Sequence, residues 1–266
     1  MALLEVGRFA RDALAQGEGT VCAVFGRSLY LRFPDERFAC IGDRSLGRGP
    51  LNALVSDWPR FASLAPGARL RLSTQGAKRW QAPRTVRPAC GPRLAARIEA
   101  LVCAASGCAP HEGLGGAIAG DSSPLLRHAR PAMAALDRWL AAPRRAAVPE
   151  PAHALIGLGP GLTPSGDDYL GGMLVALRAL GRAQSAAALW RWVSARLPGR
   201  TSAISGAHLA AAAAGEAHEA LHDCLAALLG ARALRWSDRL ERLGRLGHCS
   251  GWDALAGALA VARAAR

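Results

Sequence analysis

The spacing of apolar residues changes near residue 90, and this change limits the possible folds more than any other feature of the chain. Between residues 20 and 88, TVCAVFGRSLYLRF and RFACIGD alternate or cluster apolar residues, with turn signals at Gly26-Arg27 and Pro34-Asp35. GPLNALVSDW and ARLRLS indicate further strands. About five short strands with one early helix predict a small β-barrel or sandwich-like domain.

Beyond Pro92 the apolar spacing becomes helical. Helices are expected in RLAARIEALVCAA, LLRHARPAMAALDRWLAA, residues 165–180, AAALWRWVSARL, the alanine-rich stretch after Thr201, EALHDCLAALLGA and the C-terminal end. The glycine-rich segment 106–124 between them suits a flap, and residues 142–151 suit a linker. We therefore expect an α+β protein, with a β-rich domain over residues 1–90 and a mainly helical domain over residues 91–266.

Length and composition favour a cytoplasmic globular protein. The chain has 266 residues, enough for a substantial core. Charged residues interrupt the N-terminal MALLEVGRFARDAL, which therefore does not resemble a signal peptide, and no apolar run approaches the ~18 residues of a membrane span. The seven cysteines are scattered without a CxxC pair, as expected in a reducing compartment.

The formal net charge of +13 comes almost entirely from arginine, since Lys78 is the single lysine. The arginines are spread along the chain without a basic block or interleaved aromatic residues. Nucleic acid and membrane are therefore not expected as partners. A few arginines at a site for a small anion suit this distribution better.

The stretch GLGPGLTPSGDDYLGG, residues 157–172, is typical of a helix start. It predicts Thr163 as the N-cap and Pro164 as the first helical residue. Asp167 and Asp168 fall in the first turn, where the helix dipole favours carboxylates, so a purely structural explanation of both exists.

A functional explanation of the same stretch is also open. The glycines allow close approach of the backbone to a ligand, and helix-start N–H groups beside the Thr163 and Ser165 hydroxyls suit phosphate or carboxylate. Asp167 and Asp168 would then bind an ammonium group, an amide N–H or Mg²⁺, or act as a base. Residues 157–172 contain no lysine, which excludes a Walker phosphate-binding loop. Leu162 breaks the glycine pattern of dinucleotide-binding loops.

The second half of this stretch is repeated near the C-terminus. SGDDYLGGMLVALRA (165–179) and SGWDALAGALAVARA (250–264) align without gaps and pair Asp168 with Asp253. A weaker copy begins at Ser205, with His208 in place of the aspartate. Either the small residues of the repeats serve close packing of helices, or several helix starts converge on one polar pocket.

The second explanation defines the candidate site. The candidate catalytic residues are Asp167, Asp168 and His248. The candidate substrate-binding residues are Gly159, Gly161, Thr163, Ser165, Gly166, Thr201, Ser205, Ser250, Gly251 and Asp253.

His248 and Cys249 precede the second repeat. His248 suits an acid or base near neutral pH, although a lone histidine is more often structural, and the helix start predicts a lowered pKa for Cys249. No histidine and cysteine spacing matches a zinc site, so we assign no metal ligands. No cofactor is assigned with certainty, and Mg²⁺ at the aspartates remains open.

At GLGPGLTPSGDDYLGG the chain resembles the family of the AllH-type subunit of oxamate carbamoyltransferase, long described only as a domain of unknown function. The resemblance extends to TSAISGAHLAAAAAGEAHEAL (201–221), to GHCSGWDALAGAL (247–259) and, more weakly, to GPLNALVSDW (49–58).

This resemblance implies a cytoplasmic subunit of a carbamoyltransferase that works with other subunits in allantoin and purine catabolism. The implied reaction converts oxalurate and phosphate to oxamate and carbamoyl phosphate. The alternative is a non-catalytic assembly subunit or a sensor of small anions. A free-standing kinase or hydrolase is less favoured, because a lysine-bearing phosphate loop is missing.

Overall fold

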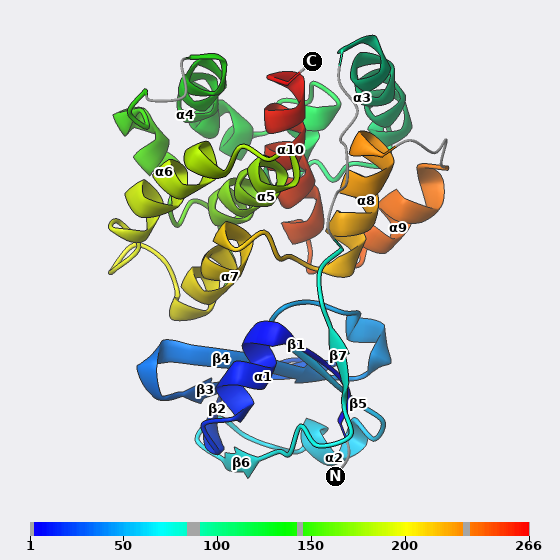
Figure 1. Cartoon of the computed structure of the whole chain (residues 1–266), viewed down its shortest axis with the longest axis vertical. Coiled ribbons are helices and arrows are strands. Elements are labelled where there is room, and N and C mark those ends of the chain that lie inside the picture. Colours follow the sequence, from blue (N-terminus) through cyan, green and yellow to red (C-terminus); the bar gives the residue numbers. More distant parts are fainter. Residues whose placement is uncertain (1–2, 84–90, 143–145, 231–234, 266) are drawn as a thin grey trace. The chain divides into compact units, whose positions relative to one another are not determined.

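The computed structural model describes residues 3–83, 91–142, 146–230 and 235–265 (Figure 1). The chain divides into two compact units, residues 1–83 with 216–219, and residues 84–215 with 220–266. The sheet dominates the first unit and helices dominate the second, which confirms the expected α+β class. The domain boundary expected at residue 90 falls in 84–90, outside the described residues.

The first unit is built on a seven-stranded mixed sheet in the order β6-β2-β3-β4-β5-β1-β7. The β1–β7 and β4–β5 pairs are parallel, and the other pairs are antiparallel. The strands are β1 (Leu3–Gly7), β2 (Glu18–Val24), β3 (Ser28–Phe33), β4 (Arg37–Gly42), β5 (Asn52–Val55), β6 (Arg69–Arg71) and β7 (Lys78–Trp80).

Strands β2 to β6 lie in the segments where the sequence predicts strands, whereas β1 and β7 were not predicted. The early helix is present as α1 (Arg8–Leu14). In β1 the burial pattern does not alternate, since Glu5 lies between apolar residues at a register shift against β5. Strand β7 is only three residues long, too short to show a period.

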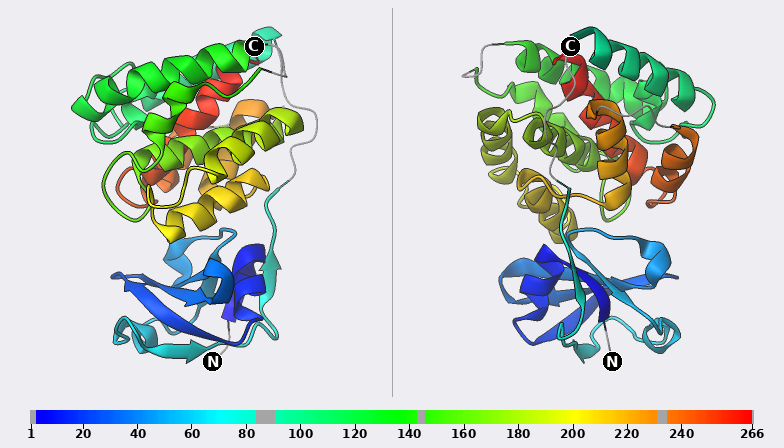
Figure 2. Two further views of the ribbon diagram at one scale, coloured as in Figure 1. Left: turned by 90° about the vertical axis from the view of Figure 1, so that its left-hand side faces the viewer. Right: turned by 45° about the vertical axis from the view of Figure 1, so that its right-hand side comes forward.

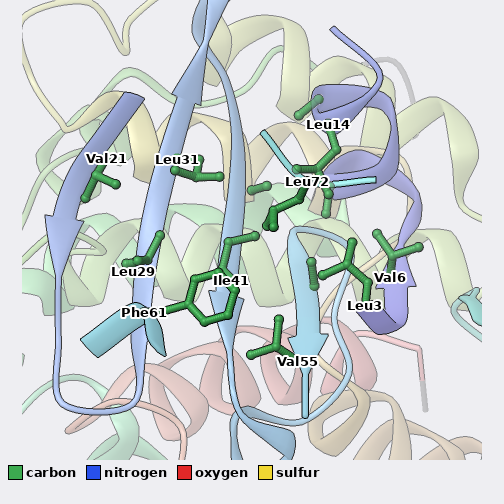
Figure 3. Close-up of a cluster of buried hydrophobic side chains, with 14 of the residues drawn as sticks. Leu3, Val6, Leu14, Val21, Leu29, Leu31, Ile41, Val55, Phe61 and Leu72 are labelled. Atoms are coloured by element: carbon green, nitrogen blue, oxygen red, sulfur yellow. The ribbon is translucent and has the colours of Figure 1, made fainter. Parts of the chain in front are cut away.

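Apolar side chains of the sheet, α1 and α2 (Pro59–Ala62) form the core of the first unit, as Figure 3 shows. Leu29, Leu31 and Ile41 are fully buried on the central strands. Leu14 of α1 and Phe61 of α2 belong to the same cluster.

The second unit consists of helices joined by short loops and 3₁₀ turns. The helices are α3 (Gly91–Ala105), α4 (Pro124–Ala141), α5 (Ser165–Ala179), α6 (Ala183–Ser194), α7 (Ala203–Ala213), α8 (Glu219–Leu229), α9 (Ser237–Gly244) and α10 (Ser250–Arg263). All but α9 lie where helical spacing predicts them. None of the helices in the described ranges is long and apolar enough to span a membrane.

Helices α5 and α10 pack closely against each other in the interior of this unit (Figure 2). Their contact is reciprocal: a Cβ atom at Gly172 would overlap the carbonyl oxygen of Ala254, and one at Gly257 would overlap that of Tyr169. In the repeat alignment, Gly172 corresponds to Gly257 and Tyr169 to Ala254. The repeated glycines are therefore explained by packing, because each lets its helix reach the backbone of the other.

We predict that Gly172→Ala destabilises the helical unit by about 3 kcal/mol, because the added methyl group would overlap the backbone carbonyl of Ala254. Gly171→Ala is the matched control. A Cβ there lies 3.8 Å from Ala212 and Leu209, an ordinary contact, and alanine is the better helix former by about 1 kcal/mol. Urea unfolding of the two variants measures the difference. Equal stability would contradict the packing explanation.

Candidate functional site

The two repeated helix starts meet in the helical unit. The hydroxyl oxygens of Thr163, before α5, and Ser250, the first residue of α10, are 3.1 Å apart and share a hydrogen bond. Asp168 and Asp253 follow in the first turns, close enough for the Asp253 charge to raise the pKa of Asp168. The structure thus brings together Asp168 and Asp253, which are predicted site residues 85 positions apart in the sequence.

The predicted capping of α5 was wrong by one residue. Pro164, with φ −57° and ψ 145°, is itself the N-cap, and no side chain caps the helix. The proline ring fixes φ but leaves ψ extended, so the helix begins at Ser165. The Thr163 hydroxyl is therefore directed to Ser250 instead of to the helix backbone.

Several helix-start N–H groups that an anion would need already donate to protein oxygen atoms. The Gly166 N–H donates to the Leu158 carbonyl at 2.9 Å, and the Gly251 N–H to the Leu246 carbonyl at 3.3 Å. At α7, the Ser205 N–H donates to the hydroxyl of Ser202, the N-cap, at 2.9 Å. An anion at these helices would therefore depend more on the Thr163, Ser165 and Ser250 hydroxyls.

Asp167 has a complete set of protein donors. Its side chain is 1% exposed. Its Oδ1 accepts from the Gly157 N–H at 2.9 Å, and its Oδ2 accepts from the Ser205 hydroxyl at 2.7 Å and from the Thr201 hydroxyl. The third repeat thus converges on this carboxylate, and Asp167 connects the glycine loop, α5 and the start of α7.

Asp168 and Asp253 differ from Asp167 because each keeps an unused oxygen. Asp253 is 1% exposed, and its Oδ1 accepts from the N–H groups of Leu114 at 2.6 Å and Gly115 at 2.8 Å. Its Oδ2 is buried without a partner among the described residues, as is Oδ2 of Asp168. Buried carboxylate oxygens normally have donors, so these two are open positions for a ligand's N–H, a proton or a cation.

The environment favours the protonated form of both acids. Burial raises the pKa of Asp253 to about 6, although the Ser165 hydroxyl and two backbone N–H groups favour its ionised form. Burial likewise raises the pKa of Asp168 well above its ordinary value, and the charges of Asp253 and Asp167 add to this effect against the Ser250 and Thr163 hydroxyls. The surroundings thus shift both acids toward the protonated form.

The predicted lowering of the Cys249 pKa was wrong. Burial raises the pKa of this thiol to about 11, and the carboxylates of Asp253, Glu112 and Asp168 act in the same direction. Although Cys249 is the N-cap of α10, these effects outweigh the helix dipole. Without a cation nearby, Cys249 does not have the properties of a nucleophile.

The glycine-rich segment 106–124 covers the Asp253 side of the site. Gly113 approaches α10 so closely that a Cβ on it would lie 2.6 Å from Asp253 Oδ1 and 2.8 Å from the Cys249 Cβ. The next residue, Leu114, supplies one of the N–H groups on Asp253. The segment therefore forms part of the site.

Glu112 of the same segment lies against His248, whose Nε2 contacts the Glu112 carboxylate. Ligand atoms of Glu112, His248 and Cys249 all lie within 4.8 Å of one another. Sequence reasoning missed this group, because Glu112 comes from a loop far from the other two residues. The signal available was the glycine-rich composition around Glu112, which permits such a close approach.

The predicted glycines lie at different parts of the site. Gly159 has a positive φ, and Ser165 lies against the position that a Cβ atom on Gly159 would occupy. Gly161 is exposed, with open space at the corresponding position. Gly166 and Gly251 each pack on a backbone carbonyl, of Leu155 and Leu243 respectively. The two helix starts are thus buried in equivalent ways, and Gly161 is free for an external contact.

A separate cavity of about 290 Å³ lies further along α10. Tyr169, Asp137 and Arg263 are its polar lining residues, and the rest of its lining is apolar. Burial raises the pKa of the Tyr169 phenol, as does the nearby Asp137 carboxylate. None of the predicted site residues lines this cavity.

Residues 155–262 match the family model of the oxamate carbamoyltransferase subunit AllH. The resemblance seen in the motifs is confirmed over this range. The match covers helices α5 to α10 and includes Asp167, Asp168, His248 and Asp253. The weaker likeness at 49–58 lies outside it and stays a prediction. Searches of curated proteins and of solved structures found no match.

We predict opposite effects of replacing the two adjacent aspartates. Asp167→Ala leaves three donors without their acceptor and should lower the free energy of unfolding by at least about 3 kcal/mol. Asp168→Asn should be neutral or stabilising, because it removes an acid whose ionised form is disfavoured by burial. Urea denaturation provides both values. A marked loss of stability for Asp168→Asn would assign that residue a structural role as well.

The raised pKa of Asp253 predicts a pH dependence of stability. A folded pKa of about 6, against about 3.9 in the unfolded chain, means that the folded state binds the proton more tightly. The contribution is fully present below about pH 3.9 and is lost as the pH rises through about 6. Relative to Asp253→Asn, the wild type should lose about 3 kcal/mol across this window. Parallel stability curves for the two proteins would refute the shift.

Proposed function

We propose that the chain is a subunit of a carbamoyltransferase of the oxamate carbamoyltransferase type. The family match over residues 155–262 supports this assignment. In the proposed reaction, oxalurate and phosphate give oxamate and carbamoyl phosphate, in allantoin and purine catabolism in the cytoplasm. The other subunits of the enzyme are the expected partners.

The observation that carries the proposal is the acid pair with unused oxygens. Oxalurate is an acylated urea whose N–H groups are hydrogen-bond donors, and Oδ2 of Asp168 and Asp253 are buried acceptors without donors. A buried acceptor discriminates strongly in favour of a ligand that supplies the missing donor. The pair therefore suits a carbamoyl or amide group better than it suits a bare phosphate.

The chemistry of the reaction needs an acid at this place. An oxygen of phosphate attacks the carbamoyl carbon, the bond from that carbon to the oxamate nitrogen breaks, and the nitrogen must gain a proton as it leaves. Asp168, whose raised pKa favours the protonated form, supplies that proton and regains one from the incoming hydrogen phosphate. The hydroxyls of Thr163, Ser165 and Ser250 are the groups proposed to hold the anionic ends.

A second candidate function is supported by the burial of the same oxygens. Oδ2 of Asp168 and Oδ2 of Asp253 have almost no solvent-accessible surface, and segment 106–124 binds Asp253 through two N–H groups. A closed site of this kind also suits an assembly or anion-sensing subunit, in which the acids respond to binding without performing chemistry.

We predict that Asp168→Asn and Asp253→Asn each lower the rate of phosphate-dependent oxalurate cleavage by about 100-fold or more in the reconstituted complex. The measurement is carbamoyl phosphate formation, with complex assembly followed by size-exclusion chromatography. Asp137→Asn is the matched control, since this carboxylate lines the separate cavity and should leave the rate unchanged.

The outcomes separate the two functions. Full activity of Asp168→Asn in an intact complex would exclude the acid role and favour the assembly subunit. Loss of activity together with loss of assembly would also point to the assembly function. Loss of activity in an assembled complex supports the catalytic subunit.

A further inference from the structure

We propose that Glu112, His248 and Cys249 form a binding site for a divalent transition-metal ion of the Zn²⁺ class. The site joins the glycine-rich segment 106–124 to the start of α10. It goes beyond the proposed carbamoyl transfer and does not depend on it.

The geometry allows one ion to contact all three side chains. Their ligand atoms lie within 4.8 Å of one another. Two tetrahedral zinc ligands at about 2.1 Å from the metal are about 3.4 Å apart, so the three ligand atoms need to move only a short distance toward one another. Glu112 and His248 are exposed, which leaves them free to make this adjustment.

The donor set selects the kind of metal. An imidazole nitrogen, a thiolate sulfur and a carboxylate oxygen are the three ligand types that zinc uses, whereas Mg²⁺ and Ca²⁺ require mainly oxygen. Zinc sites with three protein ligands keep a fourth position for water or a substrate atom. His248, considered from sequence as an acid or base, is in this proposal a ligand.

A second and independent observation points to a cation at this place. Asp253, buried to 1% exposure, keeps Oδ2 without a partner and lies against the same group through Gly113. Gly113 adjoins Glu112, and a Cβ on it would touch both Asp253 and Cys249. The Glu112 carboxylate lies within 4.8 Å of the Cys249 sulfur, and a bound cation would offset the negative charge gathered beside Asp253.

The bound metal would also determine the position of segment 106–124. In the structure, this segment is held to α10 by hydrogen bonds on Asp253 and by the contact between Glu112 and His248. A shared metal ion would link Glu112 of the segment to His248 and Cys249 at the start of α10. Metal binding would therefore stabilise the closed form of the segment over the acid pair.

The test is Co²⁺ and Zn²⁺ binding to the purified whole chain, freed of any polyhistidine tag. With Co²⁺, a thiolate-to-metal charge-transfer absorption should appear at one equivalent, and Cys249→Ser should abolish it. Glu112→Gln and His248→Ala should each weaken binding by about tenfold or more. After dialysis, elemental analysis should find one zinc per wild-type chain.

The matched controls come from the same segment. His111→Ala removes an exposed histidine that pairs with Asp121 at 2.7 Å, and Cys108→Ser removes an exposed thiol. Both should bind metal like the wild type, and circular dichroism checks that every variant is folded. Absence of cobalt binding by the folded wild type, or charge transfer that persists in Cys249→Ser, would overturn the proposal. Because these measurements need no substrate or partner subunit, they are independent of the carbamoyl transfer activity.

Discussion

The close crossing of α5 and α10 is the contact on which the arrangement of the helical unit depends. Gly172 reaches the backbone of α10 at Ala254, and Gly257 reaches the backbone of α5 at Tyr169. A side chain at either position would separate the helices, since backbone atoms occupy the space it needs. The same crossing sets the first turns side by side, and so brings Asp168 to Asp253 and Thr163 to Ser250.

The acid pair carries an electrostatic cost. Two carboxylates with raised pKa and unpartnered oxygens lower the stability of the folded state at neutral pH. Asp167, one residue away, shows that the fold can satisfy a buried carboxylate completely when it supplies donors. The unused oxygens of Asp168 and Asp253 therefore contrast with their satisfied neighbour, as expected at a site where ligand binding outweighs stability.

Much of the fold and part of the site were predictable from local patterns. The change of apolar spacing predicted strands before helices, and β2 to β6 and most helices lie where expected. Strands β1 and β7 were missed because a three-residue edge strand and a strand with a register shift carry no clear period. Capping of α5 by Thr163 was wrong because Pro164 is itself the N-cap with an extended ψ, and the Thr163 hydroxyl contacts Ser250, 87 residues away in sequence.

The sequence by itself determined that two Ser-Gly helix starts, each with an aspartate and matching glycines, occur in this chain. It also carried the family resemblance, since motifs are local strings of residues. Only the tertiary structure decided which carboxylate oxygens have hydrogen-bond donors. Asp167 receives one from α7 and Asp253 receives one from segment 106–124, whereas Oδ2 of Asp168 and Oδ2 of Asp253 have none among the described residues. It likewise placed Glu112 beside His248 and Cys249, since contacts across more than a hundred residues depend on packing and leave no spacing to detect.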